Sequence, residues 1–184
     1  MGCQAIKTHS QTDLRTLSVS AAEGIPGAFD ELIGLIEKDV VRTALFLTSH
    51  FQDAEDVAQE VYVRLLRNQK DLRNVENLRG WIHAITVNVA RDHLRRRKLW
   101  EPLEKVRSWI RPLDSVESDQ FQGRLRRALS RLSFSQRSVF VLRELHEMST
   151  REVAAVLGCS EATVRGHLMA ARRRLRIHLG ELRS

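Results

Sequence analysis

The stretch that decides the fold runs MSTREVAAVLGCSEATVRGHLMAARRRLR over residues 148–176. Ser149 followed by Glu152 three residues later is the pattern of a capping box at the start of a helix. Gly158 can end that helix, because glycine enters the left-handed backbone conformation without a steric penalty. Ser160 is suited to cap the next helix. The stretch therefore predicts two helices joined by a tight turn.

The corner between these two helices carries side chains of suitable size. Ala154 is small enough to let the helices cross closely, Val164 can fill the corner, and Cys159 is expected to pack there as a small hydrophobe. Farther along the second helix, Leu168 and Leu175 fall at helical spacing. This arrangement is typical of a DNA-binding helix-turn-helix, whose second helix enters the major groove.

The outward face of the second helix is strongly basic. No Asp or Glu occurs between Ala162 and Gly180, a span that holds Arg165, Arg172 and Arg173. Arginine pairs bidentately with guanine edges or phosphate and stays charged near neutral pH. A helix dipole alone also favours cations at a helix end. The arginines therefore indicate DNA binding only in combination with the corner residues.

The composition narrows the class of protein. The 184 residues are 42% hydrophobic and only 5% aromatic, and the net charge of +7 suggests a polyanionic partner. The two cysteines fit neither a disulfide framework nor a metal site, so a reducing cytosol is expected. Neither a membrane span nor a signal peptide is evident. We expect a soluble cytoplasmic protein without direct membrane insertion.

Apolar periodicity predicts an all-α protein of two small helical domains joined by a flexible linker. Residues 1–24 are polar and weakly patterned, which favours a flexible tail. Residues 25–98 carry three amphipathic helices, the second capped by Asp53, that can bury one another's stripes. Residues 99–122 contain two prolines and an acidic run, typical of a linker. Residues 123–184 form a second helical domain that ends in the helix-turn-helix.

The segment QDAEDVAQEVYVRLLRN, residues 52–68, has an acidic and polar side. Acidic residues in a first helical turn are favoured by the dipole, which alone could explain them. They could also form a docking face for a partner. Paired carboxylates could also serve acid–base catalysis or bind a metal. However, no nucleophile, Gly-rich loop or carboxylate–histidine pattern accompanies them. We therefore expect no catalytic residue, no metal and no cofactor.

The segment LRGWIHAITVNVARDHLRRRK, residues 78–98, predicts a second DNA-contacting helix. Asn88, Arg91 and Arg95 lie opposite its apolar stripe, and asparagine and arginine contact base edges and phosphate. His83 and His93 are ten residues apart, so they do not have the i, i+4 spacing of metal ligands on one helix. Both are expected to be packing or surface residues.

Taken together, these segments resemble a bacterial RNA polymerase sigma factor of the extracytoplasmic-function (ECF) group. The resemblance covers residues 28 to about 180 and rests on DAEDVAQEVYVRL, LRGWIHAITVNVARDHLRRRK and LSRLSFSQRSVFVLRELHEMSTREVAAVLGCSEATVRGHLMAARRRLR, in that order. It implies a non-catalytic specificity subunit that directs core polymerase to promoters. Residues 25–98 and 123–184 would then be sigma regions 2 and 4.

The resemblance also implies which residues contact each partner. Region 2 would bind the clamp helices of the polymerase β′ subunit through Asp53, Asp56, Gln59, Glu60 and Arg64. It would open the −10 element, with a flipped base held by the loop at residues 74–77, through Asn74, Asn77, Asn88, Arg91, Arg95, Arg96 and Arg97. Region 4 would bind the −35 duplex through Arg151, Ser160, Glu161, Thr163, Arg165, His167, Arg172 and Arg173.

Further partners implied by the resemblance are the β flap of the polymerase and a membrane-associated anti-sigma factor that holds the protein inactive. The chain departs from the family pattern at a few positions. Family members commonly have proline at the place of Ser133 or Phe134, glycine at Glu147 and a basic residue at His167. These departures affect loop detail and promoter sequence.

Two other classes of function remain open from the residues alone. A one-component repressor would need a homodimer and a palindromic operator, with residues 25–98 sensing a ligand or forming the dimer. That segment has no evident ligand-pocket signature and carries its own basic helix. A helical enzyme acting on nucleic acid would need a catalytic constellation, and none can be assembled.

Overall fold

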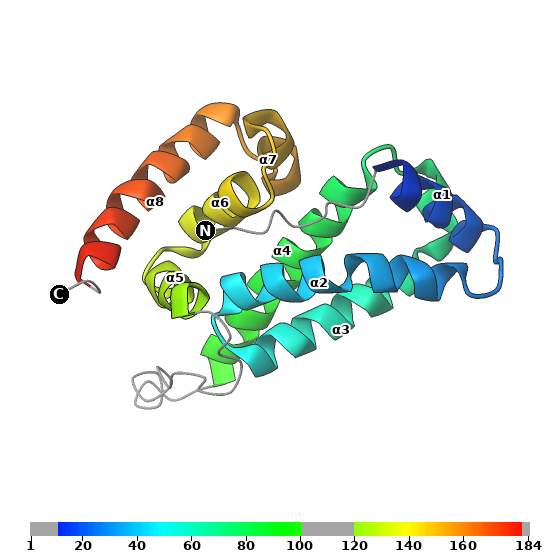
Figure 1. Ribbon diagram of the computed structural model, residues 1–184, viewed down its shortest axis with the longest axis horizontal. Helices are drawn as coiled ribbons and strands as arrows, with labels where there is room; N and C mark the ends of the chain where they lie inside the picture. Colours follow the sequence, from blue (N-terminus) through cyan, green and yellow to red (C-terminus); the bar gives the residue numbers. More distant parts are fainter. Residues whose placement is uncertain (1–10, 101–119, 182–184) are drawn as a thin grey trace.

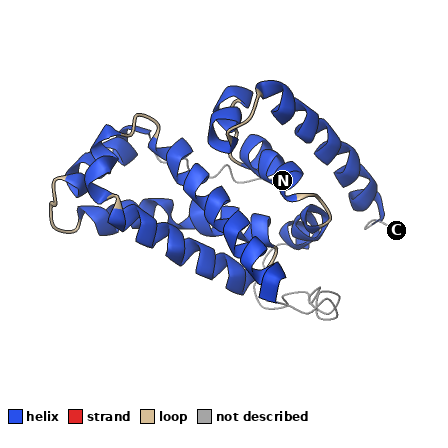
Figure 2. Ribbon diagram, turned by 180° about the vertical axis from the view of Figure 1, so that it is seen from behind, coloured by secondary structure: helices blue, strands red, loops and turns tan. Residues whose placement is uncertain are grey.

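The computed structural model of the chain describes residues 11–100 and 120–181, and every regular element in these ranges is helical (Figures 1 and 2). The all-α fold expected from the sequence is thereby confirmed. Most of the expected linker, residues 101–119, lies outside the described residues. Among the described helices, none combines the length and the apolar character needed to cross a membrane.

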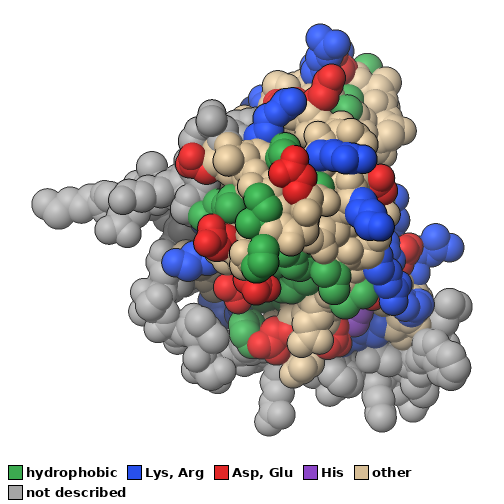
Figure 3. All heavy atoms as spheres, turned by 90° about the vertical axis from the view of Figure 1, so that its right-hand side faces the viewer, with side chains coloured by type: hydrophobic (Ala, Val, Ile, Leu, Met, Phe, Trp, Pro, Cys, Tyr) green, Lys and Arg blue, Asp and Glu red, His purple; other side chains and the backbone are tan. Residues whose placement is uncertain are grey.

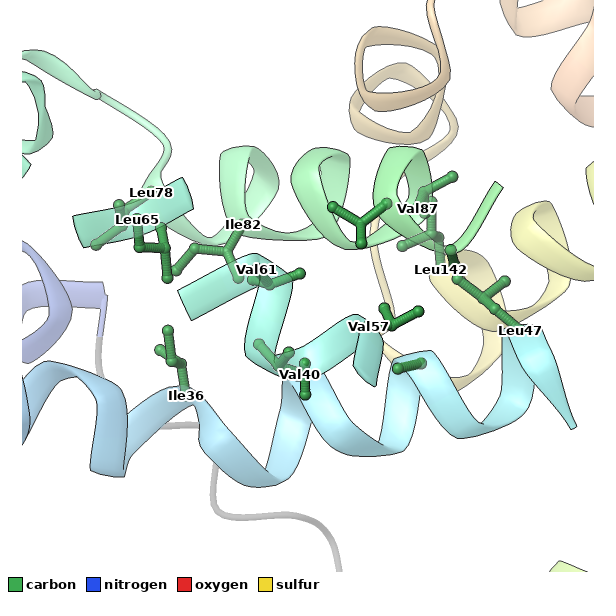
Figure 4. Close-up of a cluster of buried hydrophobic side chains, with 14 of the residues drawn as sticks. Ile36, Val40, Leu47, Val57, Val61, Leu65, Leu78, Ile82, Val87 and Leu142 are labelled. Atoms are coloured by element: carbon green, nitrogen blue, oxygen red, sulfur yellow. The ribbon is translucent and has the colours of Figure 1, made fainter. Parts of the chain in front are cut away.

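Helices α2 (Ala28–Thr48), α3 (Phe51–Arg67) and α4 (Leu78–Trp100) form the centre of the N-terminal half. Each turns its apolar stripe toward the other two, and the side chains of Val40 and Val61 meet between them (Figure 4). Burial of such side chains stabilises the fold by about 1.5–3 kcal/mol for each Val, Leu or Ile. The three expected helices are therefore present and pack as expected.

A fourth helix, α1 (Gln11–Ala22), corrects the expectation of a flexible tail over residues 1–24. It packs on α2 and on the short 3-10 helix η1 (Gln69–Asn74), and Gln69 Nε2 donates a 2.5 Å hydrogen bond to Ala21 O. The residues that it buries recur at helical spacing and are Leu14, Ser18 and Ala21. This stripe is short and two of its three residues are small or polar, so it leaves little periodic signal in the sequence.

The start of α3 also differs from the expectation. His50, not Asp53, occupies the N-cap position, so the expected Asp53 cap is wrong. Asp53 lies in the first turn of α3 and faces α4, where it pairs with His93 and Arg97. A carboxylate in a first turn still favours the helix dipole, but here it also joins two helices.

The C-terminal half consists of α5 (Gln120–Ser130), α6 (Phe134–Phe140), α7 (Thr150–Leu157) and α8 (Glu161–Glu181). A capping box of Ser133 and Gln136 starts α6, and a π-helical turn, η3 (Val141–Leu145), continues it. Ser133 thus caps this helix through its own hydroxyl group.

The two halves share one apolar core. Leu142 of η3 lies next to Val87 of α4 and Leu47 of α2 (Figure 4). Val139, Met148 and Val153 of the C-terminal half belong to the same buried cluster. We call the contact between α2 and α4 on one side and α6, η3 and α7 on the other the seam.

Arg137 of α6 crosses the seam with only 9% of its surface exposed. Its Nη1 donates to Leu47 O at 2.5 Å and to Ser49 Oγ at 3.3 Å, and its Nη2 donates to Ser130 O at 3.1 Å and Leu132 O at 3.2 Å. The carbonyls at the ends of α2 and α5 carry the negative ends of the helix dipoles, which suits a cation. Burial lowers the pKa of Arg137 to about 10, so the group stays charged near neutral pH.

Candidate nucleic-acid interface

The helix-turn-helix forms as the sequence predicts. Ser149 and Glu152 make a complete capping box on α7, and Gly158 ends that helix at φ 64°. The Ser160 hydroxyl accepts the Thr163 N–H at 3.1 Å at the start of α8. The corner is filled by a fully buried Val164. These local contacts fix the angle at which α8 leaves the domain.

The outward face of α8 is open. Arg165, Arg172 and Arg173 are exposed, as are Ala162 and Gly166 between them. Met169, in the middle of this face, is 73% exposed. Figure 1 shows α8 at the outer edge of the molecule, away from α1 and α3. A projecting basic helix with small residues in its first two turns is suited to the major groove.

Two arginines of this face have acidic neighbours. Arg165 lies 3.3 Å from Glu161 one turn earlier, and Arg172 Nη2 donates to Glu144 at 2.7 Å. Both pairs are exposed, and such surface pairs contribute only about 0–1 kcal/mol. Phosphate can therefore replace the carboxylates at little cost. Arg151 on α7 is exposed, while His167 on α8 is half-buried.

The corresponding face of α4 is partly occupied by the rest of the chain. Asn88, Arg95 and Arg96 are exposed. Arg91 lies over the ring of Phe134 across the seam, 5.5 Å from the ring centre. Arg97 pairs with Asp53, whose other carboxylate oxygen lies 3.1 Å from His93 Nε2. Residues predicted for two partners, DNA and polymerase, are thus brought together at Asp53.

The loop before α4 has a structural role as well as an exposed position. Asn74, Glu76 and Asn77 are exposed between η1 and α4. Asn77 Oδ1 accepts the Gly80 N–H at 2.9 Å and so caps α4. A Cβ at Gly80 would lie 2.8 Å from Asn77 Nδ2, so glycine leaves room for this cap.

The polar face of α3 is a separate surface. Asp56 and Gln59 are exposed, while Glu60 and Arg64 pair at 2.8 Å one turn apart. The hydrogen bond from Arg64 lowers the pKa of Glu60. Val63 and Leu66 on the same helix leave 40% and 54% of their surface exposed. Figure 3 shows apolar and acidic side chains side by side at the end of the molecule that carries α1.

Comparison with known proteins decides the family. Residues 32–99 match the sigma-70 region 2 family, and residues 122–175 match the sigma-70 region 4 family. The ECF RNA polymerase sigma factor SigM of Mycobacterium tuberculosis is 31% identical over 178 residues, which cover 96% of this chain and 89% of SigM. The chain belongs to the ECF sigma factors.

Other relatives agree with this placement. The RNA polymerase sigma-E factor of Streptomyces antibioticus is 32% identical over 86% of this chain and 88% of its own length. CnrH, solved in complex with the cytosolic domain of CnrY, has a TM-score of 0.70 at 26% identity, covering 92% of this chain and 98% of CnrH. Like other sigma factors, this ECF sigma factor is a polymerase subunit that directs the core enzyme to promoters.

Sequence reasoning did not identify the internal partners of the expected site residues. The partners in these pairs are far apart in the sequence and differ in chemistry. Phe134 lies 43 residues from Arg91, Glu144 lies 28 residues from Arg172, and Asp53 lies 44 residues from Arg97. No periodicity or motif connects them. A search of the sequence for acidic residues without a basic residue three or four positions away could have suggested Glu144, but not its partner.

Proposed function

We propose that this sigma factor binds core polymerase through α3 and places α4 on the −10 element and α8 on the −35 element. The observation that carries this is the separation of two kinds of surface in one chain. A polar and acidic face with exposed apolar residues lies on α3, whereas basic faces lie on α4 and α8. A polymerase-binding surface and two DNA-binding surfaces can then act at the same time.

The proposed core-binding residues are Asp56 and Gln59, with Glu60 and Arg64 beside them. Exposed Val63 and Leu66 add apolar area to this face, as the centres of protein interfaces require. Asp53 holds α3 to α4 and supports this face from within.

The proposed DNA contacts divide between helices. Asn74, Asn77, Asn88 and the α4 arginines would engage the melted −10 strand, and the α7 and α8 residues would engage the −35 duplex. Because one chain carries both surfaces, binding of one raises the effective concentration of the other at the promoter. The arginines act largely on phosphate, so isolated DNA binding should be weak and fall steeply with salt.

We further propose that an anti-sigma factor controls the protein and that it works in the cytoplasm with the polymerase. CnrH was solved with a cytosolic domain of CnrY, which supports control by a partner protein. Attachment of that partner to the membrane stays a prediction.

The test of the core-binding face is Asp56→Arg, measured by fluorescence anisotropy with labelled full-length protein and core polymerase. Charge reversal should weaken core binding by tenfold or more and leave binding to a −35 duplex within twofold. Asp30→Arg on the exposed first turn of α2 is the matched control and should change neither. Unchanged core binding by Asp56→Arg would remove α3 from the polymerase interface.

A further inference from the structure

Two histidines meet inside the seam. His83 of α4 and His146, directly after η3, have ring centres 4.2 Å apart and an interplanar angle of 49°. They leave only 2% and 4% of their surface exposed. One ring belongs to region 2 and the other to region 4, so their contact exists only while the two regions are packed together.

Hydrogen bonding fixes the neutral form of His146. The Thr43 hydroxyl donates its single proton to Asp39 O at 2.6 Å. His146 Nε2, 2.7 Å from the same oxygen, must therefore be the donor to Thr43. His146 Nδ1 then carries no proton and has no hydrogen-bond partner among the described residues. Both ring nitrogens of His83, one of which carries a proton in the neutral form, also lack a partner there. An added proton would be buried without an acceptor.

The charges around the pair oppose protonation further. Arg42 of α2 and Arg79 of α4 face His146, and Arg79 also faces His83. Two acid groups on the helices of the seam have other partners, because Asp39 of α2 lies 3.9 Å from Arg79 and Glu152 of α7 bonds to Ser149. Arg143 of η3 interacts with Glu152 and donates a hydrogen bond to Met148 O.

From this geometry we propose that His83 and His146 form an acid-sensitive latch, and that proton uptake by the two rings separates region 4 from region 2. Separation would expose both rings to water and release Arg91 from Phe134. Acid would thereby shift the chain from the packed form toward a form in which Arg91 of α4 is free. The latch is a property of the chain itself and does not depend on the proposed promoter contacts.

The sign of the effect follows from the two protonation states. Burial lowers the pKa of His83 to about 4 and that of His146 to about 2, below the value near 6.5 of an exposed histidine. The packed form is therefore fully favoured above about pH 6.5 and loses this advantage as the pH falls toward 4. Between pH 7.5 and 5.5 each ring should raise the opening constant about tenfold, or about 100-fold together.

The test uses the full chain carrying Lys70→Cys and Ala155→Cys for donor and acceptor dyes, with Cys3→Ser and Cys159→Ala removing the native thiols. Both labelled positions are exposed, one in region 2 and one in region 4. Energy-transfer efficiency is followed from pH 7.5 to 5.5. The expected result is an increase of about 100-fold in the opening constant. A change below about threefold would overturn the proposal.

Variants identify the groups responsible. His83→Leu keeps an apolar contact, and His146→Gln keeps a donor for Thr43. Each should reduce the pH dependence to about tenfold, and together to under threefold. His178→Gln in α8, away from the seam, is the control and should keep the full 100-fold dependence. The double variant could already be open at both pH values. In that case the His83→Leu single variant is the test, and a 100-fold pH dependence of its opening constant would contradict the latch.

Discussion

Helices α4 and α8 both present arginines to solvent, but the rest of the chain engages them differently. On α8 only exposed acids, Glu144 and Glu161, lie beside the basic face. On α4 the ring of Phe134 covers Arg91, and the less exposed Asp53 holds Arg97. The proposed −35 face is thus available in the packed form, whereas the proposed −10 face is partly used to hold the molecule together.

The cause of this difference is the position of each helix. Helix α8 begins at a corner that local caps define, and only its apolar side packs on α6, α7 and α5. Helix α4 contacts α2, α3 and α7 and so runs through the middle of the shared core. A helix buried on several sides has few residues that serve DNA alone. The proposed −10 face should therefore respond most to changes at the seam.

The largest effect is expected from Arg137→Met, which removes the cation that crosses the seam. Four hydrogen bonds are lost and buried carbonyls at the ends of α2 and α5 are left without a donor. We expect the free energy of unfolding to fall by about 3 kcal/mol, measured by urea titration of the full chain. Arg127→Met on the exposed side of α5 should change it by less than about 0.5 kcal/mol. Equal effects would show that the seam adds no stability.

Arg165→Ala should weaken binding by the proposed DNA face of α8 without affecting that of α4. Loss of one arginine from the proposed DNA face of α8 should cost about 1–3 kcal/mol, or tenfold or more in affinity for a −35 duplex. Binding to a −10 single strand should stay within twofold. Arg174→Ala is the control, because Arg174 lies on the same helix but contacts Gln136 of α6. An equal loss for both variants would indicate general charge attraction in place of a defined face.

Phe134→Ala should make the arginines of α4 more accessible to DNA, as those of α8 already are. Removing the ring frees Arg91 from a cation–π contact of about 0.5–1 kcal/mol. We expect affinity for a −10 single strand to rise about two- to fivefold, measured by anisotropy, with −35 affinity unchanged. A weaker −10 affinity would mean that Phe134 positions Arg91 for DNA.

The smallest effect concerns the capping box at the start of α7. Hydrogen bonds from Ser149 lower the pKa of Glu152, so the stability that this carboxylate adds is present above its ordinary value near 4.5 and is lost below it. The drop in the thermal midpoint between pH 5 and 3 should be smaller in Glu152→Gln than in the parent chain. Glu31→Gln, at an exposed position on α2, should keep the parental drop.

Features of the helix-turn-helix corner were predictable from the sequence, whereas contacts across the seam were not. Ser149, Gly158 and Val164 were predictable because each acts within a few residues of its position, by capping, by a left-handed turn or by filling a corner. The basic faces followed from helical spacing in the same way. The α1 helix was missed because Ser18 and Ala21 bury little apolar surface.

Contacts across the seam were beyond sequence reasoning for a different reason. Arg137 lies 90 residues from Leu47, and His146 lies 103 residues from Thr43. A buried arginine in an amphipathic helix and a single histidine have the same local pattern as exposed ones. Only the packing of α6 and η3 on α2 and α4 distinguishes them.

The most direct test of the account is transcription in vitro with core polymerase on genomic DNA, with and without this protein and with no anti-sigma factor present. We predict a defined set of transcript 5′ ends that appears only with the protein, preceded by shared −10 and −35 sequences. Asp56→Arg and Arg165→Ala should each reduce these transcripts. If adding the protein yields no 5′ ends beyond those of core polymerase alone, the proposed use of α3, α4 and α8 in promoter-directed initiation is contradicted.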